Sequence, residues 1–208
     1  MDSARERILS KLRKRVDPSE PLPYPNASKG GLFFEATDAL EVLFAEQFAS
    51  NGGRFVYCNS VQELVEQLHS LSTHRKWEAI HCKENELHQL LGNTPLPLKK
   101  EVEQPLQVPA SLTTCEALIA RTGSVLLSSN TAAGRSLSIV PPVHLVLATP
   151  NQIVYHLQEI LSLQTAREEN WPSMLCFAST NSRTADIEKT LVNGAHGPKE
   201  LFVFLLDT

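Results

Sequence analysis

The chain has 208 residues, of which 42% are hydrophobic and 20% are charged, and its formal net charge is −4 at pH 7. This composition is typical of a soluble globular protein with one domain and room for a terminal extension. No apolar run approaches the roughly 20 residues that cross a bilayer, and the first residues lack the apolar core of a secretion signal, so we expect a cytoplasmic protein without a membrane span.

Residues 1–16 are basic, with six Lys and Arg against two Asp and Glu, whereas the remainder carries 13 Lys and Arg against 21 Asp and Glu. Within this basic segment an apolar residue recurs at every fourth position, at Ala4, Ile8, Leu12 and Val16. The spacing predicts an amphipathic helix that docks on the acidic body or on a partner subunit. The segment lacks the interleaved aromatic residues of single-strand binders, so we expect no nucleic-acid partner.

Four prolines lie between residues 17 and 31, which predicts an extended linker. We therefore expect two parts. Residues 1–31 form the basic helix and its proline-rich linker, and residues 32–208 form an α/β domain.

Helical and strand patterns alternate along the first half of that domain. We expect a helix over 33–50, a strand over 54–58, a helix over 61–71, a strand over 79–82 and a helix over 85–91. Ser60 and Glu63 have the spacing of a capping box before the second of these helices. The proline-rich residues 95–109 predict an edge strand or a loop. This order indicates a largely parallel sheet covered by helices.

In the second half we expect a helix over 115–120 capped by Thr113, strands over 124–128, 143–148, 174–178 and 201–206, a polar loop over 130–136 and a helix over 152–165. A further helix is expected to start at Arg183, with Ser182 as its N-cap and Gly194 as its C-cap. A right-handed strand–helix–strand connection would place the polar turn before Arg183 at the carboxyl end of a strand, where α/β proteins bind ligands.

Arg183, between Ser182 and Thr184 at a helix start, has the surroundings of an anion site. Backbone N–H groups, the helix dipole and the guanidinium would all point at a carboxylate or phosphate. The alternative is a structural salt bridge from Arg183 to Asp186.

Two histidines are ambiguous in the same way. His144 lies inside an apolar strand, where an imidazole is costly unless its polar atoms are satisfied. It is therefore either a site residue or a core histidine bonded to the backbone. His196, followed by Gly197, is either a proton donor or a turn residue. Gly123, Gly134 and Arg135 lie on loops that would face one pocket, although Gly123 also suits a simple turn.

The four cysteines, Cys58, Cys82, Cys115 and Cys176, show neither CxxC spacing nor a histidine at ligand spacing. We therefore predict buried, inert thiols and no zinc or iron–sulfur centre in this chain. The chain also lacks the glycine-rich phosphate-binding motifs and the GxSxG elbow of common enzyme classes.

The run Ser182-Arg-Thr-Ala-Asp-Ile-Glu188, followed by Gly194-x-His-Gly-Pro198 and an apolar terminal strand, resembles the signature of the LUD-domain family, typified by lactate-utilisation protein C. The runs Thr122-Gly-Ser124 and Gly134-Arg-Ser-Leu-Ser-Ile-Val-Pro-Pro-Val-His144 resemble the middle segment of that family. The matching motifs extend from about Thr113 to Asp207. The family usually has Gly-Pro-Ser-Arg where this chain has Thr180-Asn181-Ser182-Arg183.

The resemblance implies a three-layer α/β/α sandwich with a mostly parallel sheet, like the fold shared by sugar isomerases (NagB/RpiA), CoA transferases and formyltetrahydrofolate cyclo-ligases. It also implies a cofactor-free subunit that works beside iron–sulfur proteins in oxidising L-lactate to pyruvate, and that binds the carboxylate or organises the complex. The alternatives are a stand-alone transferase or ligase of this fold group and a non-catalytic ligand-binding module.

Loop position and resemblance together give two sets of candidate residues. The candidate ligand-binding residues are Thr122, Gly123, Gly134, Arg135, Ser182, Arg183, Thr184 and Gly197. The candidate catalytic residues are His144, His196 and Asp186, and no metal ligand is expected.

Overall fold

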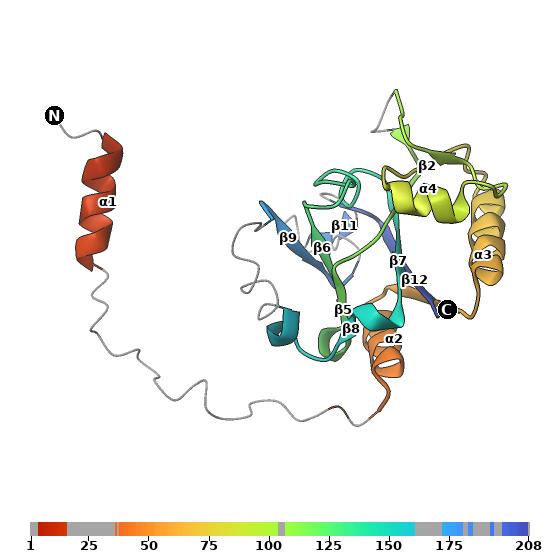
Figure 1. The fold of residues 1–208 in the computed structure, drawn as a ribbon, viewed down its shortest axis with the longest axis horizontal. Coiled ribbons are helices and arrows are strands. Elements are labelled where there is room, and N and C mark those ends of the chain that lie inside the picture. Colours follow the sequence, from red (N-terminus) through yellow and green to blue (C-terminus); the bar gives the residue numbers. More distant parts are fainter. Residues whose placement is uncertain are drawn as a thin grey trace. The chain divides into compact units, whose positions relative to one another are not determined.

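The computed structural model describes residues 4–15, 36, 38–103, 107–160, 172–180, 183–184, 192–193 and 197–207. The chain divides into two units, Met1–Glu35 and Ala36–Thr208. In the first unit, helix α1 spans Ala4–Arg15 (Figure 1), which confirms the helix predicted from the four-residue apolar spacing.

The second unit is built on a six-stranded sheet in which every strand pair is parallel. In spatial order the strands are β1 (Arg54–Cys58), β12 (Glu200–Leu206), β7 (Val143–Ala148), β4 (Ala110–Thr113), β2 (Ile80–His81) and β3 (Leu98–Lys99). The central strands β7 and β12 are near-continuous apolar runs, as expected for parallel strands with both faces covered. The predicted α/β class with a mostly parallel sheet is therefore confirmed.

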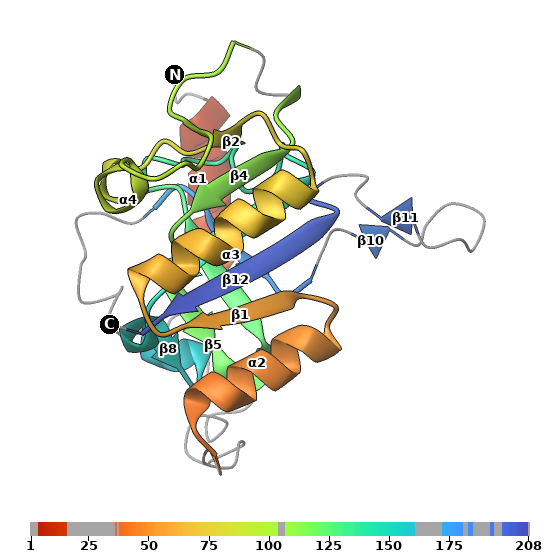
Figure 2. The same ribbon diagram turned by 90° about the vertical axis from the view of Figure 1, so that its right-hand side faces the viewer.

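Helices α3 (Val61–His74) and α4 (Asn85–Leu91) cover one face of this sheet, and α3 runs alongside β12 in Figure 2. The hydroxyl of Ser60 caps α3 by accepting a hydrogen bond from the Glu63 amide. The Glu63 carboxylate accepts its bond from the amide of Asn59 rather than from that of Ser60. The predicted start of α3 is therefore confirmed, while the reciprocal half of the capping box is displaced by one residue.

The other face is covered by α2 (Leu40–Ser50) and by a second, four-stranded sheet. The strands of this sheet are β8 (Ile153–Val154), β5 (Ala117–Ile119), β6 (Ser124–Ser128) and β9 (Leu175–Ala178), in that order. Their inward side chains pack with Phe44 and Phe48 of α2 against Val146 and Val203 of the large sheet. The unit therefore has three layers, and one outer layer is partly a sheet.

Two predicted helices of the second half are wrong where the small sheet forms. Residues 117–119 are a fully buried strand paired antiparallel with β6, followed by a 3-10 turn, η2, at Ala120–Thr122. Pro150–Gln152 forms the 3-10 turn η3, and β8 follows, so α-helix is present at residues 157–160 but not before them. Residues 161–165 of that predicted helix lie outside the described residues. In both segments, pairing between strands that are close in space outweighs a helical pattern in the sequence.

The helix predicted to start at Arg183 is also wrong at its first two residues. Arg183–Thr184 forms strand β10, paired antiparallel with β11 at Val192–Asn193. The rest of that predicted helix lies outside the described residues. Thr180, in the hydroxyl-rich segment that suggested a helix cap, donates to the distant carbonyl of Asn51.

Candidate functional site

Three hydroxyl groups join the middle motif to the start of the C-terminal motif. Thr122 Oγ1 lies 2.7 Å from Ser124 Oγ, and Ser124 Oγ lies 2.7 Å from Ser179 Oγ. Ser124 is buried, and the antiparallel pairing of β6 with β9 brings its strand beside the segment that precedes Ser179. The structure therefore brings predicted site residue Thr122 close to the segment that leads to Arg183.

The C-terminal end of α2 holds the same two segments together. The side-chain amide of Asn51 donates to the Thr122 carbonyl at 3.0 Å, and the Asn51 carbonyl accepts a bond from Thr180 Oγ1 at 2.5 Å. One residue thus links the turn after β5 to the segment after β9. These links fix the backbone from which Ser182, Arg183 and Thr184 follow.

Gly123 itself is explained by packing. Its φ is +57°, and a Cβ built on it would lie 2.4 Å from the backbone nitrogen of Phe48 in α2. Only glycine combines a left-handed conformation with so close a backbone approach. The geometry of Gly123 therefore matches the turn interpretation of this residue.

The remaining candidates of the C-terminal motif are described only in part. Arg183 and Thr184 lie in strand β10. Gly197 is half-buried in a bend shortly before β12. Ser182, Asp186 and His196 lie outside the described residues.

Gly134 and Arg135 lie at the opposite end of β6 from Gly123, because the loop 129–142 begins where β6 ends. Gly134 has a φ of +61°, and a Cβ built on it would have no atom within 4 Å. The Arg135 guanidinium donates to the Ser173 carbonyl at 3.1 Å. The structure therefore does not bring Gly123 together with Gly134 and Arg135, which were predicted to share a pocket.

His144 is fully buried in β7. Its Nε2 lies 2.8 Å from Thr113 Oγ1, while no described group bonds to its Nδ1. Burial lowers the pKa of His144 to about 4, so the ring is neutral at pH 7. Its partner is a hydroxyl side chain rather than the backbone group that we expected for a core histidine.

Three polar residues form a row across one face of the large sheet. Strand pairing places His81 of β2 beside Ser111 of β4, and Ser111 beside His144 of β7. All three side chains are buried. Ser111 Oγ donates to the carbonyl of Leu137 at 2.6 Å, so the loop 129–142 is attached to the middle of this row. The sequence did not single out His81 or Ser111.

A small cavity of about 50 Å³ lies at the His81 end of the row. Its lining residues are His81, Lys83, Ser136, Leu137, Val140 and Pro141. His81 Nε2 is buried and no described group bonds to it. Burial lowers the pKa of His81, and the nearby positive charge of Lys83 lowers it further. The cavity therefore combines a neutral imidazole with a cationic side chain.

Glu84, just after β2, is another buried polar residue that the sequence did not single out. Its Oε2 accepts a bond from the Thr114 amide at 2.9 Å, and its Oε1 has no partner among the described residues. Burial raises the pKa of Glu84. The carboxylate ties the ends of β2 and β4 together.

The thiols have the environment of structural cysteines. Burial raises the pKa of Cys58 and of Cys82 to about 11, and it also raises the pKa of Cys115. Thiolates bind metals and attack electrophiles, and thiols do so poorly. Within the described part of the chain, no group of three or more His, Cys, Asp or Glu side chains is arranged to hold a metal ion.

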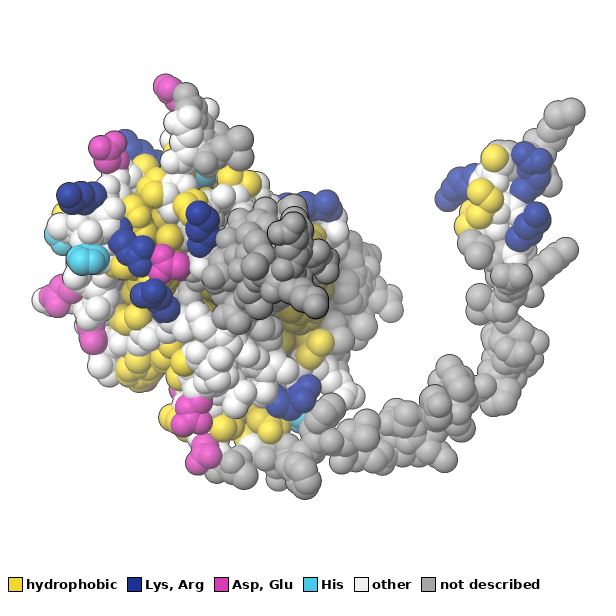
Figure 3. Space-filling view, turned by 180° about the vertical axis from the view of Figure 1, so that it is seen from behind, with side chains coloured by type: hydrophobic (Ala, Val, Ile, Leu, Met, Phe, Trp, Pro, Cys, Tyr) yellow, Lys and Arg dark blue, Asp and Glu magenta, His cyan; other side chains and the backbone are white. Residues whose placement is uncertain are grey.

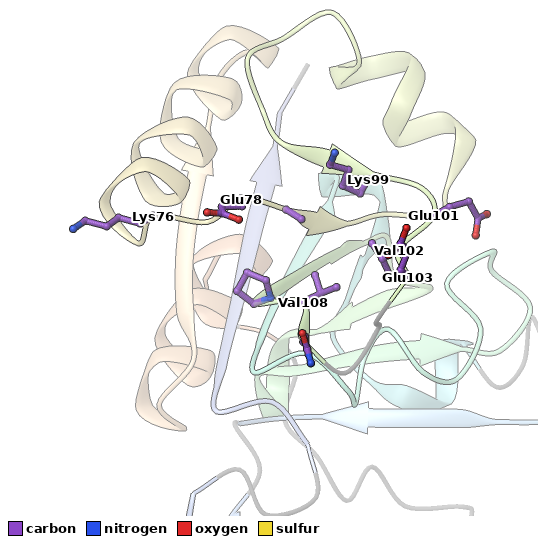
Figure 4. Close-up of a pocket in the computed structure, with 10 residues that line it drawn as sticks. Lys76, Glu78, Lys99, Glu101, Val102, Glu103 and Val108 are labelled. Carbon is purple, nitrogen blue, oxygen red and sulfur yellow. The ribbon is translucent and has the colours of Figure 1, made fainter.

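A shallower groove of about 620 Å³ opens beside β2 and β3 and contains charged side chains of both signs (Figure 4). Lys76 and Lys99 line it together with Glu78, Glu101 and Glu103. Figure 3 likewise shows basic and acidic side chains interspersed on the face that it draws. Such mixed charge does not favour one sign of ligand.

No described helix is long and apolar enough to span a bilayer.

The LUD domain matches residues 78–206, which is more than half of the chain. This chain belongs to the LUD-domain family. The match includes β2, β4, β7 and β12, and therefore the whole polar row, as well as both loops at the ends of β6.

Curated relatives agree with this membership. The chain is 34% identical over 100 residues to lactate utilization protein C of Halalkalibacterium halodurans, covering 47% of this chain and 44% of that protein. It is 33% identical over 99 residues to an uncharacterized protein of Neisseria meningitidis, covering 48% and 42%. The matches thus span less than half the length of these relatives. Lactate utilization protein C of Anoxybacillus flavithermus is 26% identical over the full length of both chains.

The crystal structure of a DUF162 family protein from Deinococcus radiodurans has a similar fold. It aligns with a TM-score of 0.58 and 17% sequence identity, covering 80% of this chain and 96% of that one. At this identity the likeness shows the fold alone.

Proposed function

We propose that this chain acts in lactate utilisation, as a cytoplasmic, cofactor-free subunit of a system that oxidises L-lactate to pyruvate together with iron–sulfur proteins. The observation that carries the proposal is the match to lactate utilization protein C of Anoxybacillus flavithermus, which covers both chains from end to end. Membership of the LUD-domain family supports the same role.

The donor groups of the chain support a subunit without its own redox centre. Electron or hydride transfer requires a carrier, and iron–sulfur clusters are held mainly by cysteine thiolates. Here burial raises the pKa of all four thiols. The clusters of the proposed system therefore belong to its partner proteins.

The proposed ligand of the chain is a small carboxylate bound near the C-terminal motif. Its proposed partners are the guanidinium of Arg183 and the polar groups of Ser182 and Thr184. Two hydrogen bonds support the proposal, because they hold the preceding residues in place: Thr180 Oγ1 donates to the Asn51 carbonyl, and the hydroxyls of Ser124 and Ser179 bond to each other.

An anaerobic pull-down of the tagged full chain from its own cells tests the proposed role. We expect cluster-bearing proteins in the eluate, which reduces a dye when L-lactate is added. Arg183→Ala should diminish lactate-dependent reduction, while Arg54→Ala, which removes an exposed arginine elsewhere on the unit, should not. A chain recovered without partners would overturn the subunit role and favour a stand-alone enzyme or ligand-binding module.

A further inference from the structure

Helix α1 presents apolar side chains to solvent. Ile8 is 59% exposed, more than any other large hydrophobic side chain in the described part of the chain. The helix has 12 residues, and isolated helices shorter than about 12–15 residues are marginal in water. A short helix of this kind gains stability when another surface covers its apolar residues, so α1 has the properties of a binding element.

The same helix is strongly basic. It contains six Lys and Arg residues against one Glu, a net charge of +5. Arg5, Arg7 and Lys11 are exposed, as Ile8 is, and Figure 3 shows Lys and Arg side chains on both sides of the hydrophobic side chains of α1. Residues 17–208 instead carry 13 Lys and Arg against 21 Asp and Glu. The excess positive charge of the chain is therefore confined to the region of α1, and it favours an anionic partner there.

An anionic bilayer surface matches both features of α1 at once. The apolar side chains of an interfacial helix enter the boundary between headgroups and acyl chains, while its long Lys and Arg side chains reach the lipid phosphates. Duplex nucleic acid would bind the positive charges alone and leave Ile8 in water. An acidic groove on a protein would need a carboxylate fixed opposite each basic side chain, because a buried unpaired charge is costly. A fluid bilayer supplies phosphates wherever those side chains lie.

The acidic character of residues 17–208 does not prevent this contact. Helix α1 ends at Arg15 and α2 begins at Leu40, so 24 residues separate the two helices in the sequence. That length of chain permits a separation well beyond the roughly 8 Å over which charges interact at physiological ionic strength. Repulsion between the acidic unit and an anionic surface is therefore screened.

We propose that α1 binds the surface of an anionic phospholipid bilayer and holds the chain there without spanning it. Ala4 and Ile8, four residues apart on one face of the helix, enter the boundary between headgroups and acyl chains. Arg5, Arg7 and Lys11 contact lipid phosphates. The binding comes from α1, so positive charges on the second unit do not strengthen it. This inference does not depend on the proposed function, because lactate has no part in it.

Co-sedimentation of the full chain with phospholipid vesicles tests the proposal. One set of vesicles contains phosphatidylglycerol mixed with phosphatidylcholine, and the other contains phosphatidylcholine alone. At low salt we expect roughly tenfold or more tighter binding to the anionic set, because each Lys or Arg near an anionic surface contributes about fivefold. The difference should shrink as the salt concentration rises. No binding to the anionic vesicles, or equal binding to both sets, would overturn the proposal.

Matched variants then assign the contact to α1. Arg7→Gln combined with Lys11→Gln should weaken binding to the anionic vesicles by roughly tenfold or more. Ile8→Gln, which keeps the charge and a good helix former, should weaken it by about threefold or more through lost apolar insertion. Lys76→Gln combined with Lys99→Gln removes the same charge from exposed positions of the second unit and should change the affinity by less than about twofold. Equal losses from the two double variants would mean that net charge alone drives binding, and the assignment to α1 would fail.

Lipid quenching reports the insertion of the apolar face directly. In Ile8→Trp, phospholipids with brominated acyl chains should quench the added indole, whereas the emission of the wild-type chain, from Trp77 and Trp171 of the second unit, should stay nearly constant. An added indole that is not quenched on bound vesicles would overturn the insertion. Titration with duplex DNA separates the remaining class of anionic partner. DNA binding that is tighter than vesicle binding, and unchanged in Ile8→Gln, would identify nucleic acid as the partner and overturn the bilayer proposal.

Discussion

The turn at residues 120–124 and the loop at residues 129–142 lie at the two ends of β6, and both contain residues that resemble the LUD family's middle motif. Both also contain a glycine with a positive φ. Their surroundings are different. Gly123 presses against the backbone of α2, whereas a side chain at Gly134 would enter open space.

The two segments also differ in what lies beneath them. The turn is joined to α2 and β9 through direct bonds from Asn51 and Ser179, and its core neighbours are apolar. The loop covers the polar row and is anchored there by Ser111. Residues that resemble one family motif therefore have two roles in the fold, since the turn is part of a tightly packed scaffold and the loop covers polar groups and a cavity.

Substituting alanine for each of these glycines tests the comparison most strongly. Gly123→Ala should lower the free energy of unfolding by about 2–4 kcal/mol, because a positive φ is strained for alanine and the new Cβ meets the backbone of Phe48. Gly134→Ala should lower it by only about 1 kcal/mol, the effect of the φ alone. Urea denaturation measures both. Equal losses would mean that the turn is no more tightly packed than the loop.

Acid titration tests the polar row under the loop. The native pKa of His144 is about 4, and an unfolded histidine titrates near 6.5. As pH falls below about 6.5, the His144 ring therefore binds a proton in the unfolded chain, whereas in the native chain it stays neutral until about pH 4. The free energy of unfolding therefore has its full contribution from His144 above pH 6.5. It falls progressively toward pH 4, by up to roughly 3 kcal/mol.

The measurement is the free energy of unfolding at several pH values between 7 and 4. His144→Gln should make the curve less steep over this range, since glutamine does not titrate and keeps a polar group beside Thr113; His81, whose pKa burial also lowers, accounts for part of the remaining slope. His69→Gln, at an exposed position on α3, serves as the control and should leave the curve unchanged. A wild-type curve that matches that of His144→Gln would show that folding does not lower the pKa of His144.

The sequence predicts several elements of the second unit correctly, because their signals are local. Strands β1, β6 and β7 and helix α4 have the predicted bounds, since each is a distinct apolar run or is delimited by glycine or a cap. The errors at residues 117–119, 153–154 and 183–184 share one cause. Each segment is a strand of only two or three residues, too short to show a helical or strand period of its own.

The candidate site was harder to predict for a related reason. The row of His81, Ser111 and His144 depends on the register of three strands that are distant in sequence. One signal was available. Each of these strands reads apolar, polar, apolar at its start, as in Ile80-His81-Cys82, and a polar side chain inside such a run must find a partner or line a cavity. Only His144 was singled out, because β7 alone is long enough to be recognised as buried.

The bond between Ser111 and the loop gives the smallest of the expected effects. Ser111→Ala removes the hydroxyl that donates to the Leu137 carbonyl at 2.6 Å in a buried position. The free energy of unfolding should fall by about 1–2 kcal/mol, because the carbonyl is left without its donor. Ser136→Ala, an exposed serine of the same loop, should stay within about 0.5 kcal/mol of the wild type.

Hydrogen exchange separates a loosened loop from a general loss of stability. The amides of Ile139 and Val140, which donate to the Ser136 carbonyl, should exchange faster in Ser111→Ala than the amides of β6. Uniform acceleration of both groups would mean that the loop and the scaffold open together, and the distinction between the two ends of β6 would then fail.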